Sequence, residues 1–197
     1  MTRNAFILAF VACALSALML YDGHNWGGDF SQYIAQSIAL IDDSIDSQIS
    51  NNTWIIQNSF YGLGPFIYPW GTSLIIAPIY KIFGFDLVAF KLPFCVLFGA
   101  FVFAFYRFCD KSVGAKYAII ASLIFALNPL FLHFSNNIIS DIPFMLFSFV
   151  SVVCLAHLFS ASSLCGLMPN SGGGAARLFT ARLFIARLFT LHFRATR

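Results

Sequence analysis

Few residues in this sequence carry a charge. Only 10% of the 197 residues are Asp, Glu, Lys or Arg, whereas 59% are hydrophobic, and a soluble domain averages about 25% charged residues. So few charges cannot cover the surface of one water-soluble core, which indicates that lipid surrounds most of the chain. The net charge of +3 is small and spread along the chain, so no nucleic-acid partner is expected.

Paired cysteines are also lacking. The chain has five cysteines, and none of them belongs to a CxxC pair. Their spacing therefore indicates neither a zinc site nor a disulfide framework. Because they lie in or beside apolar runs, we interpret them as small apolar side chains: Cys13, Cys95, Cys109, Cys154 and Cys165.

Long apolar runs are what the chain has in abundance. Four of them are long enough to predict membrane-spanning helices, at residues 5–21, 87–108, 115–132 and 142–159. The first run also has features of a cleaved signal peptide, with a small-residue site in ALSA. Because further spans follow it, we favour a retained first helix.

Basic residues near the ends of the runs predict the orientation. Arg3 precedes the first run, and Arg107, Lys111 and Lys116 follow the second. Positive charge near span ends marks the cytoplasmic side of a membrane. Exactly two crossings are therefore expected between residues 3 and 107, and the chain between the first two runs forms a long outer loop.

Residues 68–84, YPWGTSLIIAPIYKIFG, lie in this outer loop and are apolar but short, with two prolines. If they crossed the membrane, the Arg107 cluster would face outward. We interpret them as an interfacial or re-entrant helix. The alternative topology, with Lys81 and Lys91 on the cytoplasmic side, remains open.

A second outer helix is predicted over residues 29–45. Apolar or small side chains recur there from Phe30 to Ile41 at the spacing of one helix face, and we expect this helix to lie on the outer membrane surface. The predicted fold is thus all-α and polytopic. It has about four transmembrane helices and amphipathic juxtamembrane helices in the first outer loop.

The composition changes near residue 160. Residues 161–197 contain no Lys, Asp or Glu, and they repeat the unit ARLFT, ARLFI, ARLFT. A period of five gives neither a helix nor a strand one apolar face. We therefore divide the chain into a membrane region, 1–160, and an aberrant basic tail, 161–197, that replaces the true continuation. The alternative is a natural basic tail that binds anionic lipid.

Two aspartates are the candidates for chemistry. Asp29 opens the predicted outer helix, and Asp141 precedes the fourth span. Each position is typical of a helix N-cap. Because the topology places both at the outer face, they could also share a cavity. One carboxylate would then accept the proton of an attacking hydroxyl, while the other would position the acceptor or a divalent cation.

Four segments carry a resemblance to a known family. GGDFSQYIAQSIAL, YPWGTSLIIAPIYKIFG, FKLPF and NPLFLHFSNNIISDIPF follow one another in this order. Together they resemble the N-terminal part of GT-C membrane glycosyltransferases, in particular the protein O-mannosyltransferase and bacterial aminoarabinose-transferase-like group, over residues 1–160. The resemblance implies sugar transfer from a polyprenyl-phosphate donor to a lipid, glycan or protein acceptor. It also implies an active face on the extracytoplasmic side of a bacterial inner membrane.

The same resemblance implies roles for single residues. Asp29 would be the catalytic base or the acceptor-positioning group, and Asp141 would assist it or help to hold a divalent metal ion. Tyr33 lies one turn after Asp29 and would orient it. The aromatic residues among the remaining candidates have a plainer interpretation as interface anchors. The candidate substrate-binding residues are Tyr33, Tyr68, Trp70 and Lys91.

The family has more spans than this chain provides. We therefore expect an N-terminal fragment that lacks parts of the family's lipid-phosphate cavity. The alternatives are a non-enzymatic membrane protein, such as a small transporter or an assembly subunit, and an inactive gene fragment. A transporter would be expected to show internal repeats and polar groups in the middle of its spans, and the sequence shows no such repeat.

Overall fold

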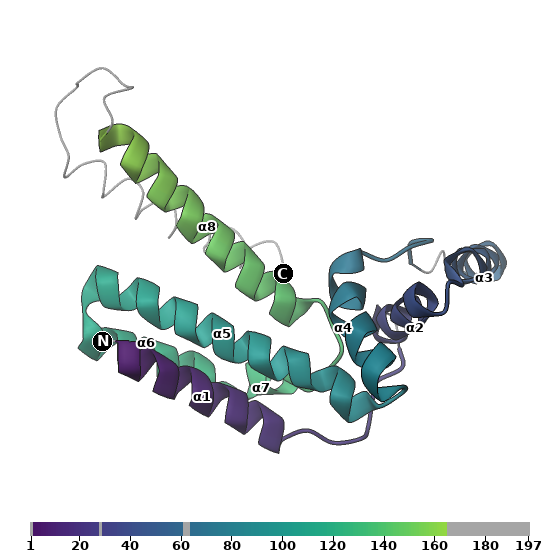
Figure 1. Ribbon diagram of the computed structural model, residues 1–197, viewed down its shortest axis with the longest axis horizontal. Coiled ribbons are helices and arrows are strands. Elements are labelled where there is room, and N and C mark those ends of the chain that lie inside the picture. The colour runs from purple at the N-terminus through teal and green to yellow at the C-terminus, as the bar shows by residue number, and fades with distance from the viewer. Residues whose placement is uncertain (1, 28, 61–63, 165–197) are drawn as a thin grey trace. The chain divides into compact units, whose positions relative to one another are not determined.

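The computed structural model describes residues 2–27, 29–60 and 64–164, and these residues form eight helices and no strand. The predicted all-α fold class is therefore confirmed. Figure 1 shows the order of the helices along the chain. Their bounds are α1 (Thr2–Leu18), α2 (Asp29–Ile41), α3 (Ile45–Asn58), α4 (Trp70–Phe83), α5 (Leu87–Val113), α6 (Ala115–Ala126), α7 (Pro129–Ser135) and α8 (Asp141–Leu164).

The chain divides into two units, Met1–Val150 and Ser151–Arg197. The first unit contains every contact discussed below. The second contains the C-terminal part of α8 and the predicted basic tail. Residues 165–197 lie outside the described residues, so the prediction about residues 161–197 stays a prediction.

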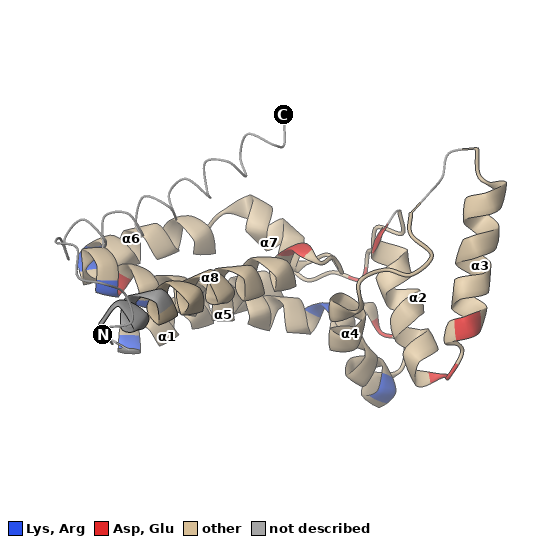
Figure 2. Ribbon diagram, turned by 90° about the horizontal axis from the view of Figure 1, so that it is seen from above, with Lys and Arg blue, Asp and Glu red and all other residues tan. Residues whose placement is uncertain are grey.

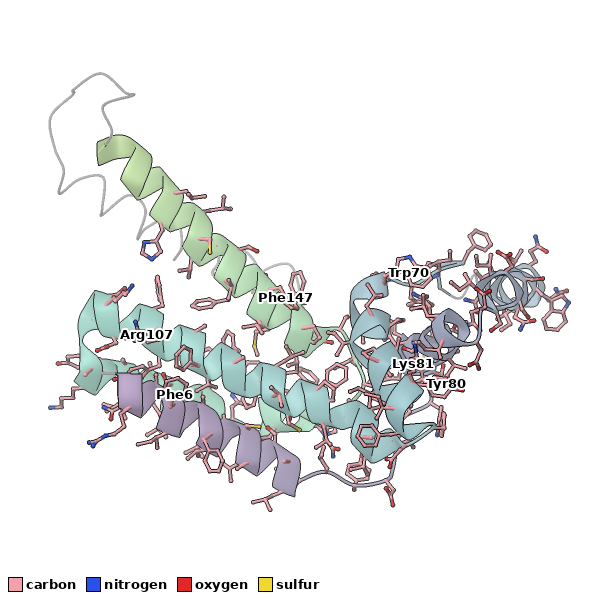
Figure 3. All side chains as sticks on the ribbon, viewed as in Figure 1. Phe6, Trp70, Tyr80, Lys81, Arg107 and Phe147 are labelled. Atoms are coloured by element: carbon pink, nitrogen blue, oxygen red, sulfur yellow. The ribbon has the colours of Figure 1, made fainter. Side chains whose placement is uncertain are left out.

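Helices α1 and α5 pack side by side and antiparallel. The rings of Phe6 and Phe103 have centroids 4.9 Å apart, and Gly99 packs against Ala9 further along. A Cβ atom on Gly99 would lie 2.9 Å from the Ala9 carbonyl oxygen, so only glycine allows this close approach. Residue numbers rise along α1 as they fall along α5, and Figure 3 shows Phe6 and Arg107 toward the same end of the pair.

Helices α5 and α6 form a second antiparallel pair. The chain turns at Gly114, whose φ of 88° is a conformation that other residues rarely adopt, and Phe105 then packs on Phe125 with centroids 4.7 Å apart. This turn and the start of α1 therefore lie at one end of the helices. Figure 2 shows Lys and Arg residues gathered at that end, as expected for a cytoplasmic end.

The antiparallel pairing supports two crossings between residues 3 and 107. If α4 also crossed the membrane, α5 would run in the same direction as α1. The arrangement therefore supports the interpretation of residues 68–84 as a helix that does not cross.

By length and composition, the described residues contain two helices able to span a membrane, α5 and the Asp141–Leu158 part of α8. Helices α6 and α7 give a third if they count as one bent span, and α1 is shorter. The predicted third span, residues 115–132, comprises α6 and the first part of α7, and the chain bends by 58° between these two helices. Asn128 caps α7 by accepting the Leu130 N–H at 2.9 Å, and Pro129 provides no N–H to continue α6.

The predicted outer helices are present as α2 and α4, but they pack on each other. Tyr33, Ile34 and Ser37 of α2 are buried. The Ser37 hydroxyl donates to the Ser73 carbonyl of α4 at 3.1 Å, and the Ser73 hydroxyl donates to the Tyr33 carbonyl at 3.2 Å. The predicted surface helix ends at Ile41 instead of residue 45, and α4 covers part of its predicted apolar face.

Helix α3 was not predicted, because its sequence is polar and has only a weak helical pattern. Two side-chain amides fasten it to the neighbouring segments. Asn52 donates to the Phe66 carbonyl at 3.0 Å, and Gln48 donates to the side chain of Gln32 of α2 at 3.0 Å. These contacts stabilise the outer loop through polar groups that hydrophobic periodicity does not reveal.

Candidate functional site

Asp29 lies in the first turn of α2 and is exposed. The hydroxyl of Tyr68 lies near its carboxylate. Burial raises the pKa of Tyr68, and the charge and hydrogen bond of Asp29 raise it further. Tyr68 therefore stays protonated at neutral pH and presents a phenol proton near the carboxylate. Its ring meets the ring of Tyr33 edge-on, with centroids 5.7 Å apart.

The side-chain amide of Gln36 fixes the backbone of Tyr68. It donates to the Tyr68 carbonyl at 3.0 Å and accepts the Tyr68 N–H at 3.1 Å. Gln36 is only 4% exposed, so these bonds are shielded from water. Sequence reasoning missed Gln36, because a single glutamine on a helix belongs to no motif. The available signal was a polar residue beside the apolar face of α2.

Gly64 closes the other side of Tyr68. Its φ is 74°, and a Cβ atom at this position would overlap the Tyr68 hydroxyl oxygen. Trp70 follows shortly afterwards in the first turn of α4, where its side chain is half-buried. Figure 3 shows Trp70 at one end of α4 and Tyr80 and Lys81 toward the other. Tyr68 and Trp70 were both predicted to bind substrate, and the structure brings Tyr68 to Asp29.

His24 stands in the segment that leads to Asp29. Its ring packs edge-on against Trp26 and Phe30, with centroid distances of 4.8 and 6.1 Å. Both ring nitrogens are buried, and neither completes a hydrogen bond with the described part of the chain. Burial lowers the pKa of His24, the charge of Lys91 lowers it further, and the backbone of Phe30 only partly opposes these effects. A neutral imidazole therefore lies in the segment before the carboxylate.

Lys91 of α5 is fully buried. Its ammonium group donates to the carbonyls of Tyr21 at 2.7 Å and Gly23 at 2.6 Å. It also lies 4.4 Å from the centre of the Tyr21 ring, within the range of a cation–π interaction. The predicted substrate-binding role of Lys91 stays a prediction, and its observed partners are backbone groups of the segment after α1.

Asp141 begins α8 and is exposed. Just before it, the Asn136 side chain donates to the Met19 carbonyl at 3.1 Å. This bond ties the segment that leads to Asp141 to the end of α1, from which the chain also leads to Asp29. The structure thus brings the two segments to one end of the α1–α5 pair. Within the described residues, the two carboxylates share no partner.

A divalent ion fits these residues poorly. Among the residues that the structure describes, no group of three His, Cys, Asp or Glu side chains could hold a metal. Asp29 provides one carboxylate beside a phenol, whereas Mg²⁺ and Ca²⁺ require six or more oxygen ligands. Metal binding by Asp29 and Asp141 therefore stays a prediction, and the mechanism proposed below uses no metal.

The apolar helices and the polar outer segments define an integral membrane protein with an acidic group at one end of its helices. A family model described as dolichyl-phosphate-mannose-protein mannosyltransferase matches residues 65–192. This is more than half of the chain, and the chain therefore belongs to this family of membrane glycosyltransferases. The matched region includes Tyr68, Trp70, Lys91 and Asp141, and Asp29 precedes it. No curated protein and no solved structure matches the chain.

Proposed function

We propose that the chain is a GT-C membrane glycosyltransferase that moves a sugar from a polyprenyl phosphate to an extracytoplasmic acceptor. The observation that carries the proposal is the pair of Asp29 and Tyr68. An exposed carboxylate is held from one side by a protonated phenol, which is the arrangement of an oriented general base. The location that best suits this activity is a bacterial inner membrane.

In the proposed reaction, one bond to the anomeric carbon of the sugar forms and another breaks. The acceptor hydroxyl attacks the anomeric carbon of the sugar, and Asp29 takes the hydroxyl proton. The bond between the anomeric carbon and the phosphate oxygen breaks, and the polyprenyl phosphate leaves with the electron pair. Because Asp29 is exposed and Tyr68 approaches it with a single O–H donor, lone pairs of the carboxylate stay available to the acceptor.

Three further residues are assigned roles in this proposal. Asp141 would position the acceptor, which is a lipid, a glycan or a protein with a free hydroxyl or amine. Trp70 would stack on the apolar face of the sugar, since it is half-buried beside Tyr68. Tyr33 would support Tyr68 through the edge-on contact of their rings. A sugar on a lipid carrier would reach these groups from the bilayer, because the basic residues near the span ends predict that they face the outer surface.

A transfer assay tests the proposal. The full chain is reconstituted in liposomes with radiolabelled polyprenyl-phosphate mannose and a hydroxyl-rich peptide, and the label on the peptide is counted. Loss of a general base slows a reaction by about 10²–10⁴-fold, so Asp29→Asn should lower transfer by at least about 100-fold. Asp46→Asn is the control, because Asp46 is an exposed aspartate in the first turn of α3. Transfer by D29N at the wild-type rate, or no transfer by the wild-type chain, contradicts the proposal.

A further inference from the structure

We propose that Lys91 is a positioning residue, which clamps the segment between α1 and α2 and thereby holds Asp29 in place. The inference rests on the proposed role of Asp29. It differs from a direct role of Lys91 in binding substrate, because the lysine acts here through the backbone. The contacts of its ammonium group carry the argument.

The ammonium group is already engaged within the protein. A lysine has three N–H donors, and two of them bind the carbonyls of Tyr21 and Gly23 at 2.7 and 2.6 Å. The Tyr21 ring lies over the charge, and the carboxylate of Asp22 attracts it. A fully buried lysine is costly unless its charge is paired and hydrogen-bonded. These partners therefore account for the burial of Lys91 without a ligand.

The clamp fixes the start of the segment that ends at Asp29. Beyond Gly23, the His24 ring packs on Trp26, and Trp26 stacks nearly parallel to Phe85, with centroids 6.3 Å apart. At the far end, the Asp29 carboxylate lies near the hydroxyl of Tyr68. The segment is thus held at both ends and by aromatic contacts between them. Release of its first tether would let the start of α2 shift relative to Tyr68.

A phosphate-binding lysine would look different. It would present at least one N–H to a space that the donor can enter, whereas the Lys91 side chain has no exposed area. Lys81 of α4 offers the comparison within the same chain, since it is exposed. The two lysines therefore form a matched pair for experiments.

Hydrogen–deuterium exchange of the full chain in detergent tests the clamp without any activity. Lys91→Met keeps the length of the side chain and removes its charge and donors. We expect amides of residues 22–28 to exchange at least about tenfold faster in K91M, with α4 unchanged. Lys81→Met should alter neither region. Unchanged exchange of residues 22–28 in K91M overturns the proposal.

Chemical labelling of the wild-type chain keeps the proposal testable if K91M fails to fold. An amine-acylating reagent is applied with and without farnesyl phosphate, and each lysine is followed by mass spectrometry. We expect Lys81 to react while Lys91 stays unmodified in both conditions. Reaction of Lys91 at the rate of Lys81, with protection by farnesyl phosphate, assigns it to donor binding and overturns the positioning role.

Kinetics connect the clamp to Asp29. A positioning residue should lower kcat in K91M and leave the KM for the lipid-linked donor within about twofold, whereas loss of a phosphate ligand should raise that KM. An unchanged kcat in K91M contradicts the positioning role. If D29N retains full transfer while K91M loosens residues 22–28, the proposed function fails and the clamp itself stands.

Discussion

Gln36 binds both backbone polar groups of Tyr68, a residue 32 positions further along the chain. One side-chain amide thus replaces the partners that a strand or helix would supply to an extended segment. Because the hydroxyl of Tyr68 also lies near Asp29, this clamp sets the position of the phenol beside the candidate base. The outer loop is therefore organised around a tyrosine.

Gln36→Leu should destabilise the outer loop. The substitution keeps a buried side chain of similar size and leaves the N–H and carbonyl of Tyr68 without partners, at a cost of about 2–4 kcal/mol. Limited proteolysis of the loop in detergent measures the effect, with faster cleavage expected in Q36L. Gln57→Leu on exposed α3 is the control. Equal cleavage of Q36L and the wild type would show that the clamp adds no stability.

Tyr68 should titrate at higher pH than an ordinary tyrosine. An unfolded tyrosine has a pKa near 10, and burial together with Asp29 raises the pKa of Tyr68 in the fold. Tyr68→Phe should remove a high-pH step from the phenolate absorbance, and Asp29→Asn should move that step to lower pH. Asp42→Asn is the matched control. It should change only the titration of Tyr80. Burial and the charge of Asp42 raise the pKa of Tyr80, and the Tyr80 hydroxyl donates to the Asp42 carboxylate at 3.2 Å.

The raised pKa of Tyr68 also determines how the stability of the fold changes with pH. A raised pKa means that the folded chain keeps the Tyr68 proton after the unfolded chain has lost it. The contribution to stability is therefore full below pH ~10 and is lost as the pH rises through the folded pKa. As the pH rises above about 10, thermal unfolding should show a smaller loss of stability in Y68F than in the wild type. A Y68F profile parallel to that of the wild type would contradict this assignment.

Gly64→Ala should disturb the site more than its small size suggests. The added Cβ atom would overlap the Tyr68 hydroxyl, and the positive φ of residue 64 strains any other residue. The expected destabilisation is about 1–3 kcal/mol, with a fall in the pKa of Tyr68 as its contact with Asp29 is displaced. Gly71→Ala is the control, because a Cβ atom there meets nothing within 4 Å. A neutral G64A would mean that Gly64 does not support Tyr68.

The sequence predicted those features of the fold that depend on hydrophobic length and period. Helices α2 and α4 and the second and fourth spans follow from apolar runs and from one helical face. Helix α3 was missed because polar side chains such as Asn52 hold it. The bend between α6 and α7 was also missed. Its signal was the Asn128–Pro129 pair inside an apolar run, where an N-cap and a missing N–H outweigh hydrophobicity.

The candidate site was predicted only in part. Asp29, Tyr33 and Tyr68 were named from the sequence, and the structure brings these three together. The contact between Asp29 and Tyr68 could not be predicted, because no local sequence pattern joins two residues so distant along the chain. Asp141 was paired with Asp29 by topology alone, and the structure places their segments at one end of the helices without a shared partner.

The central claim is that Asp29 and Asp141 open onto one outer face of the membrane. Single-cysteine variants at positions 29, 141 and 107 test it in sealed right-side-out vesicles, after replacement of the native cysteines. A membrane-impermeant maleimide should label positions 29 and 141 from outside, and position 107 only after permeabilisation. Labelling of positions 29 and 141 from opposite sides would contradict the shared site and the proposed chemistry.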